Sequence, residues 1–207
     1  KIQKITDRSA WAIIEHIKSG NFNPSDFELK LKEGRIDRVD KLSDEGDIYI
    51  KVIDYKSGKT EFDPTLVENG IQLQLIYYMD KVIDRESKAN PSKNVMPGGA
   101  FYFNIKDPIL EFEETMTDDD VITEKLLDQF QMTGVVNSCE KVLVGMDQHI
   151  VDGAKTSRIN KAKYKDIDTD MRLGRTVSVL SNDNFLELIE RVKDKVTDIT
   201  REIMDGK

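Results

Sequence analysis

Hydrophobic and polar residues follow two different spacings along the chain, and each spacing predicts a type of element. Residues 7–20 place large apolar side chains at helical spacing before Gly20, at Trp11, Ile13, Ile14 and Ile17. Residues 27–42 alternate on both sides of a Lys-Glu-Gly turn, and residues 48–56 alternate again after a short polar segment. The pattern predicts a helix followed by a three-stranded antiparallel meander.

The middle of the chain predicts a second helix and a fourth strand. Apolar residues recur at intervals of three and four up to Ile83, from a helix start at Asp63 and Pro64, with Gly70 interrupting the first turns. The aromatic and branched run at residues 100–108 is bounded by Gly and Pro, which is typical of a strand. The predicted order is therefore helix, three strands, helix, strand.

The remainder of the chain is expected to add helices to this core. Residues 117–133 have the pattern of a helix capped around Thr117, whereas residues 134–180 are mixed. Residues 181–206 predict an amphipathic helix with a cap at residues 181–183 and an apolar stripe of Phe185, Leu188, Ile189, Val192, Val196, Ile199 and Ile203. We expect one domain over residues 1–207, with its core at about 7–106 and a helical extension at about 107–207.

Composition is that of a soluble globular protein. The chain has 207 residues, 34% of them charged and 38% hydrophobic, which suffices for one substantial core. No apolar run approaches the ~20 residues of a membrane span and no signal peptide opens the chain, so we expect no membrane partner. The single cysteine, Cys139, excludes an internal disulfide framework and predicts a structural thiol in a cytoplasmic protein. Because the sequence opens at Lys1 without Met, we interpret it as a piece of a larger protein.

The charges of the chain give two opposing indications of whether it binds nucleic acid. The net charge of −8 argues against broad nonspecific attraction to DNA or RNA. Residues 155–165 nevertheless gather five cations around Tyr164, namely Lys155, Arg158, Lys161, Lys163 and Lys165. This segment either follows a single strand through phosphate contacts and one stacking ring, or is a solvated basic loop.

The third predicted strand ends in charged residues that share its apolar face. With a period of two, Asp54 and Lys56 continue the row of Ile48, Ile50 and Val52. A charge on a buried face costs several kcal/mol unless a partner or a metal compensates it. Asp37 lies on the strand expected to pair with this one, so both carboxylates can point at one divalent cation with Lys56 in the same pocket. The alternative is an ion pair at the end of a strand.

Three segments in this order resemble a known family: GRIDRVD at residues 34–40, IKVIDYKSGK at 50–59 and GIQLQLIYY at 70–78. Together they resemble the PD-(D/E)XK nucleases of the RecB type, in particular the nuclease domains of bacterial helicase–nuclease subunits. The resemblance covers nearly the whole chain. It implies an α/β (α+β) fold with a restriction-endonuclease-like core. It also implies that Asp37 and Asp54 are metal ligands with the backbone carbonyl of Tyr55, and that Lys56 is the catalytic lysine.

Gln74 and Tyr78 match the Gln-x-x-x-Tyr element of the same family. Their spacing places both on one helix face, where the amide and the phenol can meet a phosphate or the catalytic lysine. The alternative is a helix face with ordinary polar residues. Glu28, on the first strand, is a further carboxylate near the site, although its spacing does not decide a role.

Two features of the family are not matched. Its histidine ligand belongs to an upstream helix in a Gly-Thr-x-x-His context, which does not match the surroundings of His16, so we interpret His16 as a helix-surface residue rather than a ligand. The family also places closely spaced cysteines beyond the C-terminal helix, where they hold an iron–sulfur cluster. That cluster is expected only in the full-length protein and not in this chain.

The resemblance implies a nuclease that depends on Mg²⁺ or Mn²⁺ and hydrolyses single-stranded DNA. Its partners would be DNA and a helicase/nuclease subunit acting in DNA repair and recombination. A stand-alone RecB-type exonuclease is the first alternative. The second is an inactive nuclease-like module that binds DNA or a partner, which the intact Asp-x-Lys argues against.

Overall fold

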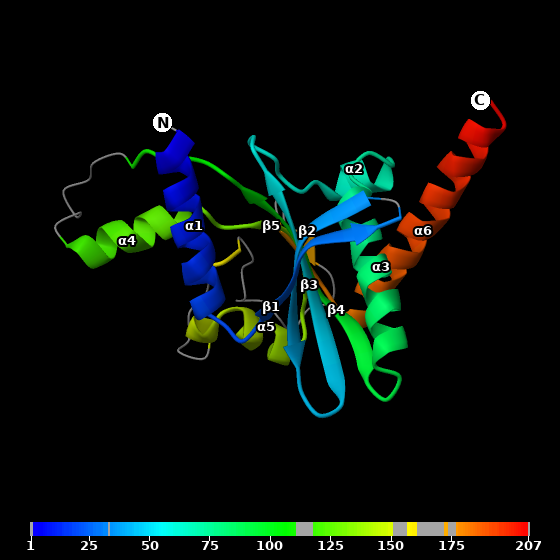
Figure 1. The fold of residues 1–207 in the computed structure, drawn as a ribbon, viewed down its shortest axis with the longest axis horizontal. Helices are drawn as coiled ribbons and strands as arrows, with labels where there is room; N and C mark the ends of the chain where they lie inside the picture. The colour runs from blue at the N-terminus through cyan, green and yellow to red at the C-terminus, as the bar shows by residue number, and fades with distance from the viewer. Residues whose placement is uncertain are drawn as a thin grey trace.

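The strands of the chain form one mixed sheet in a computed structural model that describes residues 2–32, 34–110, 118–150, 157–160, 172–173 and 177–206 (Figure 1). Within these residues the sheet has seven strands in the order β1-β2-β3-β4-β5-β7-β6. The strands are β1 (Asn23–Leu31), β2 (Gly34–Ser43), β3 (Asp47–Lys56), β4 (Asn94–Asn104), β5 (Thr133–Asn137), β6 (Arg172–Leu173) and β7 (Val177–Leu180).

The predicted meander is confirmed. Strand β2 pairs antiparallel with both β1 and β3, so the first three strands follow one another along the chain and in the sheet. Strand β4 then pairs parallel with β3, after a crossover through α2 (Pro64–Glu68) and α3 (Gln74–Ala89). This parallel pairing places the ends of β3 and β4 side by side at one edge of the sheet.

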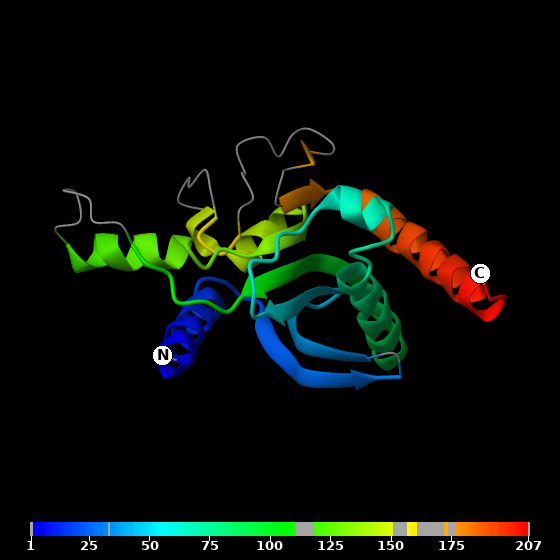
Figure 2. The ribbon, with the colours of Figure 1, turned by 90° about the horizontal axis from the view of Figure 1, so that it is seen from above.

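Helices cover both faces of the sheet, and each face has its own apolar core (Figure 2). One core packs α3 and α6 (Asn182–Met204) against the sheet. The other packs α1 (Ile2–Lys18), α4 (Asp119–Asp128) and α5 (Glu140–Met146), the last followed by a short 3₁₀ helix, Gln148–Ile150. No helix within the described residues is both long enough and apolar enough to cross a membrane.

The helix predicted from Asp63 to Ile83 is two helices. The side chain of Asp63 accepts a hydrogen bond from the Thr65 backbone N–H and caps α2, as the sequence predicts. Helix α2 then ends before Gly70, whose φ of +80° is a left-handed conformation that side chains disfavour. The chain restarts as α3 at Gln74, which places the Gln-x-x-x-Tyr pair in the first turns of a new helix.

The expected helical extension is wrong in part, because it also contributes strands. The helix predicted over residues 117–133 is confirmed only over Asp119–Asp128, and Thr117 lies outside the described residues. All five residues of β5 are buried, and β5 pairs with β4, so these residues continue the sheet. The last helix is confirmed, with the Ser181 hydroxyl accepting a hydrogen bond from the Asn184 backbone N–H as its cap.

Candidate active site

Asp37 and Asp54 meet where β2 and β3 pair. Arg38 pairs with Ile53, and one further step of this antiparallel register places Asp37 opposite Asp54. The Asp37 carboxylate accepts a hydrogen bond of 2.7 Å from the backbone N–H of Tyr55. The Asp37 carboxyl is also near enough to Asp54 to raise the pKa of that carboxyl. The two carboxylates predicted from the sequence are therefore neighbours.

Lys56 completes the group on the same strand face. Its Nζ lies 2.6 Å from Asp54 Oδ2, with 30% of the Lys56 side chain exposed against 11% of the Asp54 side chain. Apart from this ion pair, Asp54 Oδ2 is a buried oxygen without a hydrogen-bond partner among the described residues. Burial raises the pKa of Asp54, Lys56 opposes that rise, and the nearby Asp37 carboxyl adds to it.

This arrangement fits a divalent cation. Two neighbouring carboxylates, one with a buried oxygen that makes no hydrogen bond, present the hard oxygen ligands that Mg²⁺ and Mn²⁺ prefer. Within the described residues no group of three or more His, Cys, Asp or Glu side chains is placed to hold a metal. Mg²⁺ commonly takes one or two protein carboxylates and keeps its waters, so two aspartates suffice. The backbone carbonyl of Tyr55 stays a predicted ligand.

Gln74 and Tyr78 contact each other near the start of β2. Gln74 Nε2 donates to the Tyr78 hydroxyl at 3.0 Å, which confirms that they share one face of α3. The hydroxyl lies against Gly34, where an added Cβ would be 2.5 Å away. Among the described residues no hydrogen bond joins this pair to Asp37, Asp54 or Lys56. Their catalytic role therefore stays a prediction.

His16 is not the surface residue that the sequence predicts. Its side chain is 3% exposed and its ring meets Phe103 edge-on at 5.8 Å, in the core that covers the face opposite to Asp54. Helix α1 turns this side toward the sheet and leaves the larger Ile14 outside, at 48% exposed. Burial lowers the pKa of His16 to about 3, with further lowering by Lys51 and Arg38. His16 therefore lies behind the sheet and does not face the two aspartates.

A buried charged cluster behind the site was missed from the sequence. Arg38 donates to both Asp40 oxygens at 2.6 Å, and Lys51 Nζ lies 2.9 Å from Asp40 Oδ2, all within side chains that are almost fully buried. Arg38 also donates to the Tyr55 hydroxyl at 3.2 Å. The cluster joins β2 to β3 directly behind Asp37 and Asp54. The mixed polarity of the second face of β3 was the available signal for it.

The remaining candidate residues make contacts of their own. Glu28 lies opposite Asp37 in the β1–β2 register, between the pairs Phe27–Arg38 and Leu29–Ile36, so its role near the site stays a prediction. Glu28 has a φ of +51° and forms an ion pair of 2.6 Å with Arg35 across the β1–β2 hairpin. Arg158 pairs with Glu124 at 2.7 Å, while the other residues singled out in the basic segment 155–165 lie outside the described residues. Cys139 sits at the start of α5 with its Sγ 3.7 Å from the Tyr49 hydroxyl, which suits a structural thiol.

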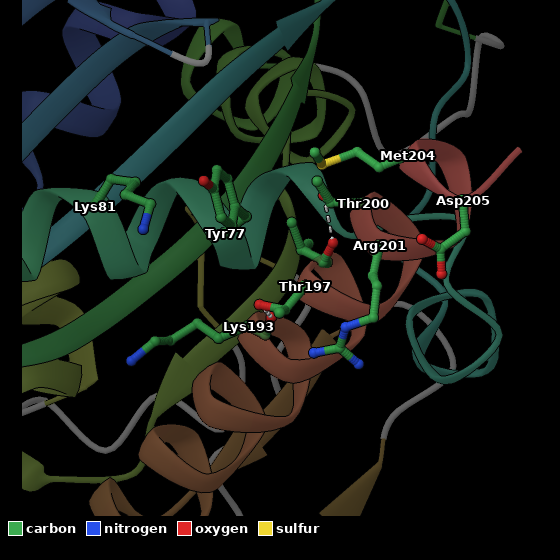
Figure 3. Close-up of a pocket in the computed structure, with 9 residues that line it drawn as sticks. Tyr77, Lys81, Lys193, Thr197, Thr200, Arg201, Met204 and Asp205 are labelled. Carbon is green, nitrogen blue, oxygen red and sulfur yellow. Dashed lines mark hydrogen bonds between the residues drawn. The ribbon is translucent and has the colours of Figure 1, made fainter.

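A groove of about 530 Å³ lies between α3 and α6 (Figure 3). It is lined by Tyr77 and Lys81 from α3 and by residues of α6 that include Lys193 and Arg201. These cations have acidic neighbours, because Asp80 pairs with both Lys81 and Lys193, and Asp198 pairs with Arg201. None of the predicted site residues lines this groove, so it is separate from the candidate active site.

The geometry of the acidic pair and the lysine points to phosphoryl chemistry. A divalent cation on two aspartates polarises a phosphate and lowers the pKa of a bound water. An ammonium beside it stabilises negative charge that develops on phosphorus. Asp37, Asp54 and Lys56 place two carboxylates and an ammonium together at one end of β3, and their roles as metal ligands and catalytic lysine stay predictions.

Comparisons with known proteins agree with this geometry. The profile of the PD-(D/E)XK nuclease superfamily matches residues 1–206. The chain belongs to this superfamily. Membership confirms both the resemblance and the restriction-endonuclease-like fold class that the sequence predicts. PD-(D/E)XK nucleases generally use divalent metals, which agrees with the oxygen ligands at the site.

Several curated relatives of this PD-(D/E)XK chain are named as one subunit of an "ATP-dependent helicase/deoxyribonuclease". The chain is 31% identical over 226 residues to the protein of Alkaliphilus oremlandii, and this match covers 100% of the chain and 19% of the relative. It is 33% identical over 225 residues to the protein of Clostridium botulinum, with 99% and 19% covered. The chain thus spans about one fifth of the length of these relatives.

Proposed function

We propose that this chain is the nuclease module of a helicase–nuclease and hydrolyses phosphodiester bonds of single-stranded DNA with Mg²⁺ or Mn²⁺. The observation that carries the proposal is the meeting of Asp37, Asp54 and Lys56 at one end of β3, with Asp54 Oδ2 buried and free of hydrogen bonds among the described residues. In this proposal the two aspartates hold the metal, and Lys56 stabilises the charge that develops on the phosphate.

The names and lengths of the relatives support the wider setting. Each is named as a subunit of an ATP-dependent helicase/deoxyribonuclease, and the chain matches about one fifth of its length. A partner subunit and DNA repair and recombination are accordingly part of the proposal, together with a cytoplasmic location. An iron–sulfur cluster is expected only in the full-length protein.

Two other functions would use the same fold. A stand-alone RecB-type exonuclease would cleave DNA without a motor, so its activity would not depend on ATP. An inactive module would bind DNA without cleaving it, but both aspartates and the lysine of the proposed mechanism are present and adjacent. Cleavage of DNA therefore distinguishes the two nucleases from the inactive module, and the dependence of cleavage on ATP distinguishes the helicase–nuclease from the stand-alone exonuclease.

The test is cleavage of labelled single-stranded DNA by the full-length protein with its partner subunit and Mg²⁺. Asp54→Ala should abolish cleavage while ATP hydrolysis and DNA binding stay near normal, because the change removes a metal ligand and not the path of the strand. Asp84→Ala is the matched control, since Asp84 is an exposed aspartate paired with Lys88 on α3. Unchanged cleavage by Asp54→Ala would contradict the proposal.

A further inference from the structure

Tyr102 lies beside the candidate active site on the neighbouring strand. Strands β3 and β4 run parallel, and Asp54 pairs with Tyr102 in their register, so both side chains leave the same face of the sheet. Tyr102 is 4% exposed and belongs to the core on the α3 side. Its side chain is therefore fixed by packing in a position next to the two charged residues of β3.

The ring of Tyr102 contacts the Lys56 ammonium. Lys56 Nζ lies 5.3 Å from the ring centroid, within the ~6 Å over which a cation is attracted to an aromatic face. Burial raises the pKa of Tyr102 to about 12, and the Asp54 carboxylate adds to the rise, so the phenol is neutral at neutral pH. The tyrosine hydroxyl makes no hydrogen bond within the described residues, which leaves the ring face as its contact with the site.

Lys56 needs such a contact because its stem is long and flexible and its side chain is 30% exposed. Its other close neighbour is Asp54 Oδ2, the same oxygen that is suited to a metal. A cation at that oxygen would compete with the ammonium for it. The ring face offers no lone pair to a hard cation, so a metal at Asp54 would not compete for the contact with Tyr102.

We infer that Tyr102 is a positioning residue whose ring holds the Lys56 ammonium at the place where it acts on the phosphate. The inference rests on the catalytic role of Lys56 in the proposed function. In this inference the aromatic ring of Tyr102 positions the Lys56 ammonium, and the Tyr102 hydroxyl has no part in it.

Nuclear magnetic resonance of this chain tests the placement without any need for activity. The ε-methylene protons of Lys56 should show an upfield ring-current shift relative to those of the exposed Lys59. The shift should persist in Tyr102→Phe and disappear in Tyr102→Leu. Unshifted Lys56 protons in the unaltered chain would overturn the inference, and this measurement does not depend on whether Tyr102→Leu folds.

Kinetics of the full-length protein on single-stranded DNA test the consequence. Tyr102→Leu should lower kcat about 5- to 30-fold, the range expected for loss of a partly buried cation–π contact, with KM for DNA unchanged. Tyr102→Phe should stay within about 2-fold of the unaltered enzyme, since it keeps the ring. Calorimetric Mn²⁺ affinity and the thermal unfolding midpoint should be unchanged in Tyr102→Phe, and Mn²⁺ affinity should also be kept in Tyr102→Leu.

The outcomes separate this inference from the proposed function. If Asp54→Ala abolishes cleavage while Tyr102→Leu cleaves at the normal rate, the positioning role fails and the nuclease site stands. If Tyr102→Phe loses as much as Tyr102→Leu, the hydroxyl and not the ring is responsible, and the inference is overturned. If Asp54→Ala cleaves normally, the proposed function itself fails.

Discussion

The surroundings of Asp54 shift its pKa in opposite directions. Burial and the nearby Asp37 raise its pKa, whereas Lys56 lowers it, and burial is the strongest of the three. A divalent cation beside both carboxylates would favour their charged forms and offset the cost of burying them. A buried aspartate, a half-buried aspartate and a single ammonium are therefore better suited to a metal than to an ordinary surface ion pair.

Lys56→Ala should separate metal binding from catalysis. The ammonium is not a metal ligand and competes with a cation for Asp54 Oδ2, so Mn²⁺ affinity measured by calorimetry should be kept or rise. Cleavage of single-stranded DNA by the full-length protein should fall at least about 100-fold, the loss typical of removing one group that stabilises transition-state charge. Lys59→Ala, which alters an exposed lysine on the loop after β3, is the control. Lost Mn²⁺ binding in Lys56→Ala would refute the assigned role.

His16 should make the stability of the chain depend on pH. Its pKa is about 3 in the folded chain, from burial and from Lys51 and Arg38, with Asp147 acting in the opposite direction, and about 6.5 when unfolded. The unfolded state therefore binds the proton first, and stability falls as the pH drops from 6.5 toward 3. This contribution has a slope of up to about 1.4 kcal/mol per pH unit.

The measurement is the free energy of unfolding in urea at pH 7, 6 and 5 for the unaltered chain and for His16→Leu. The difference in the free energy of unfolding between the unaltered chain and His16→Leu should change steadily with pH, because leucine cannot take up the proton. At pH 7 the variant should lose little, since His16 Nε2 has no hydrogen-bond partner among the described residues. If this difference in the free energy of unfolding is the same at all three pH values, His16 is not buried with a lowered pKa.

The sequence predicts which residues meet at the candidate site better than it predicts what surrounds them. Asp37, Asp54 and Lys56 follow from strand alternation and from the family motif. His16 does not, because helical spacing on α1 marks several apolar residues but does not decide which side packs on the sheet. The Arg38–Asp40–Lys51 cluster does not either, since three buried charges depend on mutual geometry that alternation cannot reveal.

The hairpin of β1 and β2 and the helix α3 meet at Gly34. A Cβ at this position would lie 2.5 Å from the Tyr78 hydroxyl, so Gly34→Ala requires the buried tyrosine to move. We expect the free energy of unfolding to fall by about 1 to 3 kcal/mol, as in other overpacked sites. Tyr78→Phe removes the clashing oxygen and should recover part of this loss in the double variant.

A double-mutant cycle of Gly34→Ala and Tyr78→Phe in urea tests this contact between elements. The cycle should show a coupling of at least about 0.5 kcal/mol, because the two residues touch. Ser181→Ala serves as a distant control that destabilises the chain through the cap of α6 and should add independently. If the effects of Gly34→Ala and Tyr78→Phe on the free energy of unfolding simply add, the Tyr78 hydroxyl does not lie against Gly34.

Element boundaries were predicted where local signals decide them and missed where long-range pairing decides them. Capping at Asp63 and Ser181 is a local signal, and both helix starts are confirmed. Strand β5 depends on its partner β4, so its five buried residues carry no local signal that distinguishes them from their helical neighbours. The strands of the sheet beyond β4 could therefore be assigned only from the structure.

The whole molecule places its apolar cores on opposite faces of one sheet, with the acidic pair on the face that α3 covers. All described strands join this sheet, and the single domain over residues 1–207 stays a prediction. The chain carries a net charge of −8, so its general attraction to DNA is weak. In the proposed helicase–nuclease, delivery of the strand by a motor would compensate for that weak attraction.

The most direct test of the site is anomalous X-ray scattering from crystals of this chain grown with Mn²⁺. The chain has 39 aspartates and glutamates, so a cation that followed charge alone could bind at many surface positions. We predict an anomalous peak between the carboxylates of Asp37 and Asp54, and no peak there in crystals of Asp54→Asn. A peak at surface carboxylates such as Asp118–Asp120, with the Asp37 and Asp54 pocket empty, would contradict the metal-dependent site.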